Sequence, residues 1–308
     1  MYNKKLPKTL YYYCSLNTFF NILTNKSIWL TEIAKSNDSM EQKFLAYEIM
    51  RNIETYIKYR CSDEMSQEDI VKLENAIYPK LCPNPTTPVW GMCLSKKRDN
   101  LSQWRGYSDD ASGMCIGFNT EYLNSINGLC DLPSIPENND CLRLRDVEYG
   151  DEAIENYFRF ISKLAPRTPK RTTSSTLKEK LERDIKGIFM RPYYKHNAFR
   201  SEAEWRIVYT KSDCEKDYSF NFEYLNRILK KTGKFEILGR KYEIRNSMLQ
   251  SHIEVKILDM LSAIDEIFIG PKSKVTIEEL EAFIRFNYDE ADINNFPNIF
   301  YSSAFSYR

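Results

Sequence analysis

The first half of the chain alternates short apolar runs with polar breaks. The runs that we predict as β-strands, rich in aromatic and β-branched residues, are 10–14, 27–31, 89–95 and 113–118. Between the first two, apolar residues recur along one face of a helix that either Ser15 or Asn17 caps. A helical pattern also covers residues 41–80 and ends at the proline-rich stretch 82–88. The predicted strands therefore come from well-separated parts of the chain.

The second half has the same mixed character. We predict helices at 152–164, 177–190 and 277–286, and strands at 205–210, 253–258, 264–269 and 299–303. The pattern contains no regular alternation of strand and helix, and the strands are dispersed over the whole length. It therefore predicts an α+β fold, with a single domain over residues 1–308 and a central mixed β-sheet. Helical insertions are expected at about 41–80 and 150–195.

A charged segment runs directly into the strand predicted at 205–210. Alternate side chains of a strand share a face, so Glu202, Glu204 and Arg206 are expected to project together, opposite the apolar residues between them. Two carboxylates at this spacing repel each other unless a cation lies nearby, and either Arg200 or Arg206 can supply it. The segment is therefore either a solvated strand face with a local ion pair or a pair of catalytic carboxylates.

The composition narrows the classes of function. The 308 residues carry Lys+Arg 44 against Asp+Glu 43, so no overall charge attracts the protein to nucleic acid or membrane. No apolar stretch reaches the length of a membrane span and the start lacks a signal peptide, so we expect a cytoplasmic protein without a membrane partner. Two histidines and no C-x-x-C pair argue against a metal site and against His-dependent hydrolases.

Several short motifs occur in a characteristic order. They are Leu10-Tyr11-Tyr12-Tyr13, Ser36-Asn37-Asp38 with Glu41, Trp104 to Tyr107, Gly113 to Phe118, Glu202-Ala203-Glu204-Trp205-Arg206, Ile269-Gly270-Pro271-Lys272 and Ser302-Ser303-Ala304-Phe305. In this order they resemble an uncharacterised bacterial family, domain of unknown function 2971, over nearly the whole chain. The sequence departs from that pattern at Ser39, where proline is common, and at Cys14, where a basic residue is common.

The order of elements also resembles, more distantly, the NAD-consuming ADP-ribosyltransferase fold, which ends in a Glu-x-Glu strand. The resemblance implies that Glu204 is the catalytic carboxylate, which stabilises the oxocarbenium-like species formed as nicotinamide leaves. It implies that Glu202 orients the acceptor or acts as a base. A carboxylate in this role must lie close to the developing positive charge in a pocket that excludes water.

The same resemblance assigns contacts with NAD to four further residues. Tyr13 would contact the adenosine side, although Tyr12 on the opposite face of the strand is an open alternative. Ser95 would position the catalytic glutamate, Tyr107 would stack on nicotinamide, and Arg206 would also contact NAD. The structural interpretation of both tyrosines is packing in the core or at its rim, since the chain holds 21 tyrosines.

Two hypotheses of function follow from the sequence. The first is an NAD-dependent ADP-ribosyltransferase that uses NAD as substrate and modifies a protein or nucleic acid, as a toxin or phage-defence effector. The alternative is a non-enzymatic module that binds a nucleotide or a partner on the same fold. Release of nicotinamide from NAD by the purified protein discriminates between them.

Overall fold

The computed structural model divides the chain into two compact units. It describes residues 6–35, 44–60, 66–68, 70–72, 75, 89–127, 141–164, 179, 192–210, 222–245, 247–289, 295–304 and 306–307. Unit 1 consists of Met1–Thr31, Trp90–Asp146 and Glu202–Arg308, and unit 2 of Glu32–Val89 and Val147–Ser201. Both stretches predicted as helical insertions fall within unit 2.

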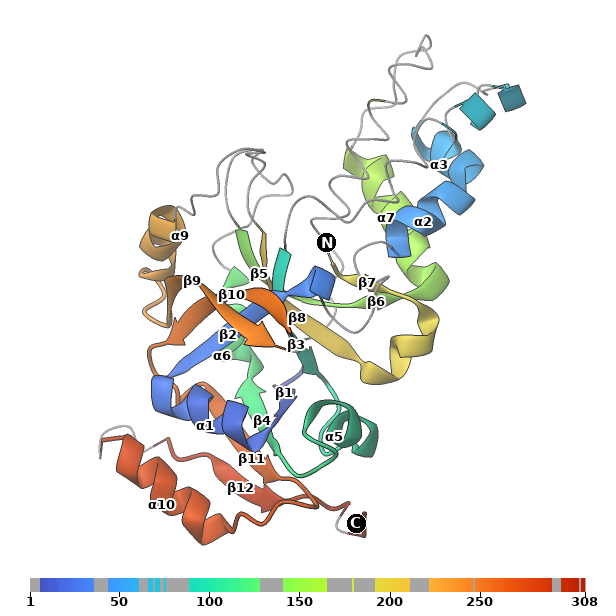
Figure 1. The fold of residues 1–308 in the computed structure, drawn as a ribbon. Coiled ribbons are helices and arrows are strands. Elements are labelled where there is room, and N and C mark those ends of the chain that lie inside the picture. The colour runs from blue at the N-terminus through green and yellow to red at the C-terminus, as the bar shows by residue number, and fades with distance from the viewer. Residues whose placement is uncertain are drawn as a thin grey trace. The chain divides into compact units, whose positions relative to one another are not determined.

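Ten of the described strands form one mixed sheet (Figure 1). Their bounds are β1 Thr9–Cys14, β2 Ser27–Glu32, β3 Val89–Ser95, β4 Met114–Asn119, β5 Cys141–Asp146, β8 Glu204–Thr210, β9 Phe235–Arg245, β10 Met248–Ile257, β11 Ile264–Ile269 and β12 Asn298–Tyr301. The order is β12-β11-β4-β1-β3-β2-β10-β9, and β8 pairs with both β3 and β5. The prediction that the strands near residues 11, 27, 89, 113 and 205 belong to one central sheet is confirmed, as is the mixed α and β character.

The helices of unit 1 begin and end where local sequence signals favour it. They are α1 Leu16–Asn25, α5 Leu101–Tyr107, α6 Thr120–Asn124, α9 Phe222–Leu229 and α10 Ile277–Asn287. Of the two candidate caps of α1, Ser15 is the one observed, because its hydroxyl accepts a hydrogen bond from the backbone N–H of Thr18 at 3.1 Å. At α10, Thr276 and Glu279 form a reciprocal capping box.

Alternation along the strands separates an apolar core from a second face. Trp90, Met92 and Leu94 of β3 and Trp205 and Ile207 of β8 point into the main core of unit 1. Full burial of such side chains stabilises the fold by about 1.5–3 kcal/mol each. The alternate residues of the same strands consequently lie on the opposite face of the sheet, where the predicted site residues are found.

Two glycines allow close contact between β4, β11 and the preceding turn. A Cβ atom on Gly113 would lie 2.1 Å from the carbonyl oxygen of Cys14. A Cβ on Gly270 would lie 2.6 Å from the carbonyl oxygens of both Ala111 and Gly113. The Gly270 N–H donates a hydrogen bond to the Gly113 carbonyl at 3.0 Å. A side chain at either glycine would therefore clash with backbone carbonyl oxygens.

Unit 2 has its own apolar cluster. Its described elements include the 3-10 segment η1 Ile33–Lys35, helices α2 Phe44–Arg51, α3 Ile53–Arg60 and α7 Gly150–Leu164, and the paired strands β6 Glu148–Tyr149 and β7 Tyr194–Lys195. Ile49, Tyr56 and Phe158 are buried together in this cluster. The Ser36-Asn37-Asp38 motif lies outside the described residues, as does the helix predicted at 177–190 except for residue 179. Of the helices that are described, none is both long enough and apolar enough to cross a bilayer.

Candidate functional site

Four of the predicted site residues share one face of the sheet. Tyr11 and Ser95 lie directly opposite each other in the β1–β3 pair, so Ser95 shares a face with Tyr11 and with Tyr13 two residues along. Glu204 and Arg206 point away from the core that Trp205 and Ile207 enter, and therefore lie on this face too. We call the face that carries Tyr13, Ser95, Glu204 and Arg206 the polar face. Tyr12 packs instead against the core on the other side.

Glu204 and Arg206 form a buried ion pair at the start of β8. The Arg206 Nε donates to Oε1 of Glu204 at 2.6 Å, and its second guanidinium nitrogen donates to Oε2 at 3.1 Å. The side chain of Arg206 is 0% exposed and that of Glu204 is 5% exposed. Of the two cations that the sequence offered for Glu204, Arg206 is the one engaged. The pair is buried, so the interpretation of a solvated strand face is wrong at these two positions.

The prediction that Glu202 shares a strand face with Glu204 is wrong. Glu202 ends the 3-10 segment η3 Asn197–Glu202, and β8 begins only at Glu204. Between them, Ala203 has a φ of 46°, in the left-handed region, which interrupts the alternation of a strand. The direction of the Glu202 side chain is therefore set by the kink at Ala203. Side chains alternate between the two faces of the strand only from Glu204 onward.

Ser95 connects the end of β3 to this kink. Its hydroxyl donates to the carbonyl oxygen of Glu202 at 2.6 Å and accepts the backbone N–H of Lys97 at 3.0 Å. The next residue, Lys96, donates its N–H to the carbonyl of Ala203 at 3.0 Å. Ser95 therefore does position a glutamate, but it holds the main chain of Glu202, whereas the sequence pointed to Glu204.

Tyr107, at the end of α5, contacts the side chain of Glu202. Its phenol donates to Oε1 of Glu202 at 2.8 Å, and the tyrosine side chain is 48% exposed. Glu202 is itself partly exposed. This carboxylate and phenol are thus accessible to a bound molecule, in contrast to the buried carboxylate of Glu204.

Tyr13 has a structural position on the polar face. Its hydroxyl donates to the carbonyl oxygen of Lys97 at 2.6 Å and accepts the backbone N–H of Asn100 at 2.9 Å. Its ring packs edge-on against Trp104, with 5.0 Å between the centroids. Burial, above all, raises the pKa of this hydroxyl well above its usual value. Tyr13 therefore shapes the loop between β3 and α5, as the structural interpretation of this tyrosine expected.

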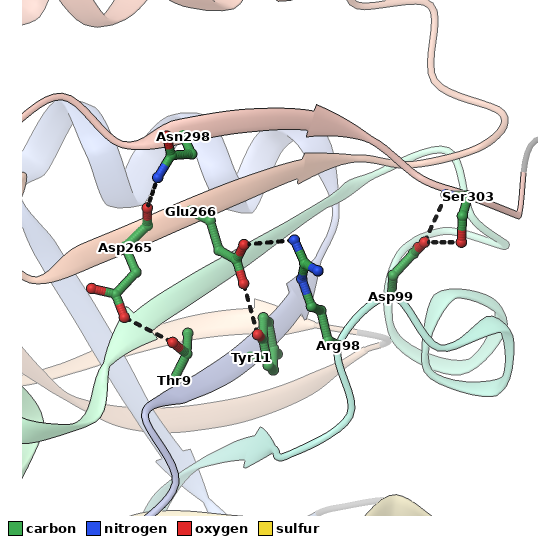
Figure 2. Close-up of polar contacts among 8 residues, drawn as sticks. All are labelled: Thr9, Tyr11, Arg98, Asp99, Asp265, Glu266, Asn298 and Ser303. Atoms are coloured by element: carbon green, nitrogen blue, oxygen red, sulfur yellow. Dashed lines mark hydrogen bonds and ion pairs between the residues drawn. The ribbon is translucent and has the colours of Figure 1, made fainter.

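A second polar cluster on the same face was not predicted from the sequence. Figure 2 shows Glu266 of β11 between Arg98 and Tyr11: its carboxylate accepts from Arg98 at 2.9 Å and from the Tyr11 hydroxyl at 2.7 Å. Arg98 also lies over the rings of Phe268 and Phe300, at 4.9 and 5.4 Å. Burial, followed by the hydrogen bond to Glu266, raises the pKa of Tyr11. Glu266 is 168 positions from Arg98 and 255 positions from Tyr11 in the chain, so local sequence carries no signal of these contacts.

Asp99 ties the C-terminal serines to the loop before α5. Its carboxylate accepts from the Ser303 backbone N–H at 2.6 Å (Figure 2). It also accepts from the Ser302 hydroxyl at 2.5 Å and from the Trp104 indole at 2.8 Å. Burial acts to raise the pKa of Asp99, but the hydrogen bonds from Ser302, Ser303 and Trp104 outweigh it and lower the pKa. The terminal Ser-Ser motif therefore has a defined structural role beside the polar face.

An apolar groove of about 550 Å³ lies between α1 and α10, apart from these residues. Its lining includes Leu16, Phe20 and Phe283, with Glu279 as the charged member. None of the residues predicted from the sequence as site residues lines it. The Glu202 and Glu204 carboxylates and this apolar groove therefore lie at different places in unit 1.

The fold and its polar face define a mixed α/β protein with its polar residues gathered where β3 ends and β8 begins. Residues 103–207 match the family model described as "Protein of unknown function (DUF2971)". The matched segment, roughly a third of the chain, runs from α5 to β8 and contains Tyr107, Glu202, Glu204 and Arg206. It supports the resemblance to that family. No curated protein and no solved structure matches the chain, so the resemblance to ADP-ribosyltransferases stays a prediction.

Proposed function

We propose that unit 1 binds NAD beside the Glu202–Tyr107 pair, next to the polar face, and that the protein transfers ADP-ribose to a protein or nucleic-acid acceptor. The observation that carries the proposal is the pairing of Glu202 with Tyr107 at 2.8 Å, beside Ser95 and Glu204. An accessible carboxylate next to an exposed aromatic ring suits a substrate with a flat leaving group and a sugar that develops positive charge. Residues from separate segments of the chain contribute to this arrangement.

The two glutamates take different roles in this proposal. Glu202 is the carboxylate that faces the substrate, and its negative charge stabilises the oxocarbenium-like sugar as nicotinamide leaves. Glu204 acts as a positioning residue, because its charge is compensated by Arg206 in a buried bidentate pair. Tyr107 holds Glu202 and offers its ring as a stacking surface for nicotinamide.

Arg145, a cationic residue that was not predicted from the sequence as a site residue, suits the diphosphate of NAD. Arg145 of β5 lies directly opposite Arg206 in the β5–β8 pair, so both arginines belong to the polar face. The side chain of Arg145 is exposed, whereas that of Arg206 is buried against Glu204. A guanidinium binds phosphate oxygens through two parallel hydrogen bonds, and Arg145 would supply this contact.

The second candidate function is a non-enzymatic module that binds a nucleotide or a partner on the same face. It is favoured by the engagement of Glu204 with Arg206 and of the Tyr13 hydroxyl with the loop backbone. The resemblance implied catalysis for Glu204 and contact with NAD for Tyr13, but both side chains form contacts that stabilise the fold. A module that binds without turnover requires no free carboxylate.

The test measures nicotinamide release from NAD, and in parallel NAD affinity by calorimetry, for wild type, Glu202→Gln and Glu204→Gln. Removing a charge-stabilising group costs about 2.7–4 kcal/mol, so Glu202→Gln should lower turnover about a hundredfold or more with little change in NAD affinity. Glu281→Gln on α10 is the matched control and should be unchanged. A larger loss in Glu204→Gln, with circular dichroism showing that this variant is folded at the assay temperature, would return the reacting role to Glu204. Binding of NAD without any release by wild type would favour the module, and no binding would refute both.

A further inference from the structure

β9 is the last strand at one end of the sheet and has a long outer edge. β9 spans Phe235–Arg245 and pairs with β10 on one side, and no strand among the described residues pairs with its other side. On one face of this hairpin (orange in Figure 1) Tyr242, Ile244 and Leu249 are 56%, 81% and 59% exposed. An exposed apolar strand edge is a ready template for pairing with another strand.

The backbone groups that point out of this edge can be identified from the hydrogen bonds of β10. The Ile257 N–H donates toward β2, to the carbonyl of Lys26 at 2.8 Å, and the Leu258 N–H donates toward β9, to Lys234 at 3.0 Å. Successive residues alternate in direction, so even-numbered residues of β10 bond to β9 and odd-numbered residues bond to β2. Each residue of β9 that is opposite an odd-numbered residue of β10 therefore points its N–H and C=O outward.

These outward residues are Arg240, Tyr242 and Ile244, which lie opposite Ile253, Ser251 and Leu249. At the start of β9, the outward groups of Ile237 are already satisfied, because the Asn226 side chain donates to its carbonyl at 2.8 Å and accepts its N–H at 2.7 Å. A register shift between Glu254 and Val255 separates that part from the rest. Beyond this shift, the outward-pointing backbone groups belong to the segment 240–244.

We propose that a second copy of this chain pairs with this edge, antiparallel and centred on Tyr242. In this register Tyr242 faces its own counterpart, and Arg240 faces Ile244 of the second copy, so every outward N–H and C=O of the segment meets an outward group. Lys241 then lies opposite Glu243 of the second copy, and Glu243 opposite Lys241. These opposed charges occupy non-hydrogen-bonded pairs, in which side chains approach most closely.

Charge selects this register over its neighbours. Moving the centre to residue 243 would put Glu243 against Glu243 of the second copy, and moving it to residue 241 would put Lys241 against Lys241. Like charges directly opposite each other destabilise a strand pair. The register centred on Tyr242 also joins the apolar stripe of Tyr242, Ile244 and Leu249 to the same stripe of the second copy.

The test uses two charge reversals, Glu243→Lys and Lys241→Glu, in the full chain. Sedimentation of the wild type should show a species of twice 36.4 kDa. Each variant alone places two like-charge pairs at the interface, so its dimer should be weaker by roughly tenfold or more. An equimolar mixture of the two variants places lysines opposite glutamates at both positions, and should restore the dimer as a heterodimer.

The mixture also controls for folding, because Lys241 forms an ion pair with Glu254 within its own chain and a misfolded Lys241→Glu variant would not rescue its partner. A second variant, Tyr242→Pro, removes an outward N–H that bonds to none of the described residues, and should be monomeric. In the wild type, exchange of the Arg240, Tyr242 and Ile244 amides should slow as concentration rises. A monomeric wild type, dimers that persist in both reversals, or a mixture without rescue would each overturn the proposal.

Discussion

Replacing Arg206 by Met should destabilise the protein by removing the cation from a buried carboxylate. Arg206 is 0% exposed and Glu204 is 5% exposed, and the two are joined by hydrogen bonds of 2.6 and 3.1 Å. Met is close to Arg in length, so the substitution fills most of the space but leaves the charge of Glu204 away from both water and its counter-ion. A substitution at an exposed ion pair would cost far less.

The expected cost is about 3–5 kcal/mol in the free energy of unfolding at neutral pH, the usual range for breaking a buried ion pair from one side. Arg206→Lys keeps the charge but loses the bidentate geometry, so its cost should be intermediate. The double variant Glu204→Gln/Arg206→Met removes both charges and should recover much of the loss.

Urea unfolding followed by tryptophan fluorescence would measure these differences, since Trp205 lies in the core beside the pair. The midpoint and slope of each variant give the change in the free energy of unfolding. A cost below about 1 kcal/mol for Arg206→Met would refute the reasoning. A double variant less stable than Arg206→Met would refute it as well, because the cost would then lie in packing rather than in charge.

Two further changes test groups elsewhere in unit 1. Burial lowers the pKa of His252, which stacks on Trp29 at 3.7 Å, so its neutral form is favoured in the folded protein and stability should fall as pH drops below about 6.5. The charged groups that act on it are Glu243, Glu254 and Lys241. His252→Phe should flatten this dependence in unfolding measured between pH 7 and 5, and an unchanged slope would contradict the assignment. Asp99→Ala should cost about 1.5–3 kcal/mol locally and speed amide exchange at Ser303, and unchanged exchange there would contradict the role of Asp99.

The site was predicted from the sequence only where local rules apply. The strand Trp205–Thr210 and the shared face of Glu204 and Arg206 follow from alternation, which is a property of each strand by itself. The prediction for Glu202 was wrong because the left-handed conformation of Ala203 interrupts that alternation, and an alanine in the sequence gives no signal of such a kink. The roles assigned to these residues stay predictions.

Elements with a clear period were predicted from the sequence, including β1, β3, β4 and α10. The hairpin of β9 with the first half of β10 was not predicted from the sequence. This hairpin is exposed on both faces, so its charged and apolar residues do not show the pattern of a buried strand. The contacts of Glu266 with Arg98 and Tyr11 were also beyond sequence reasoning. Periodicity is set by neighbours along the chain and can be read from the sequence, whereas contacts across the sheet depend on strand order and register, which only the tertiary structure decides.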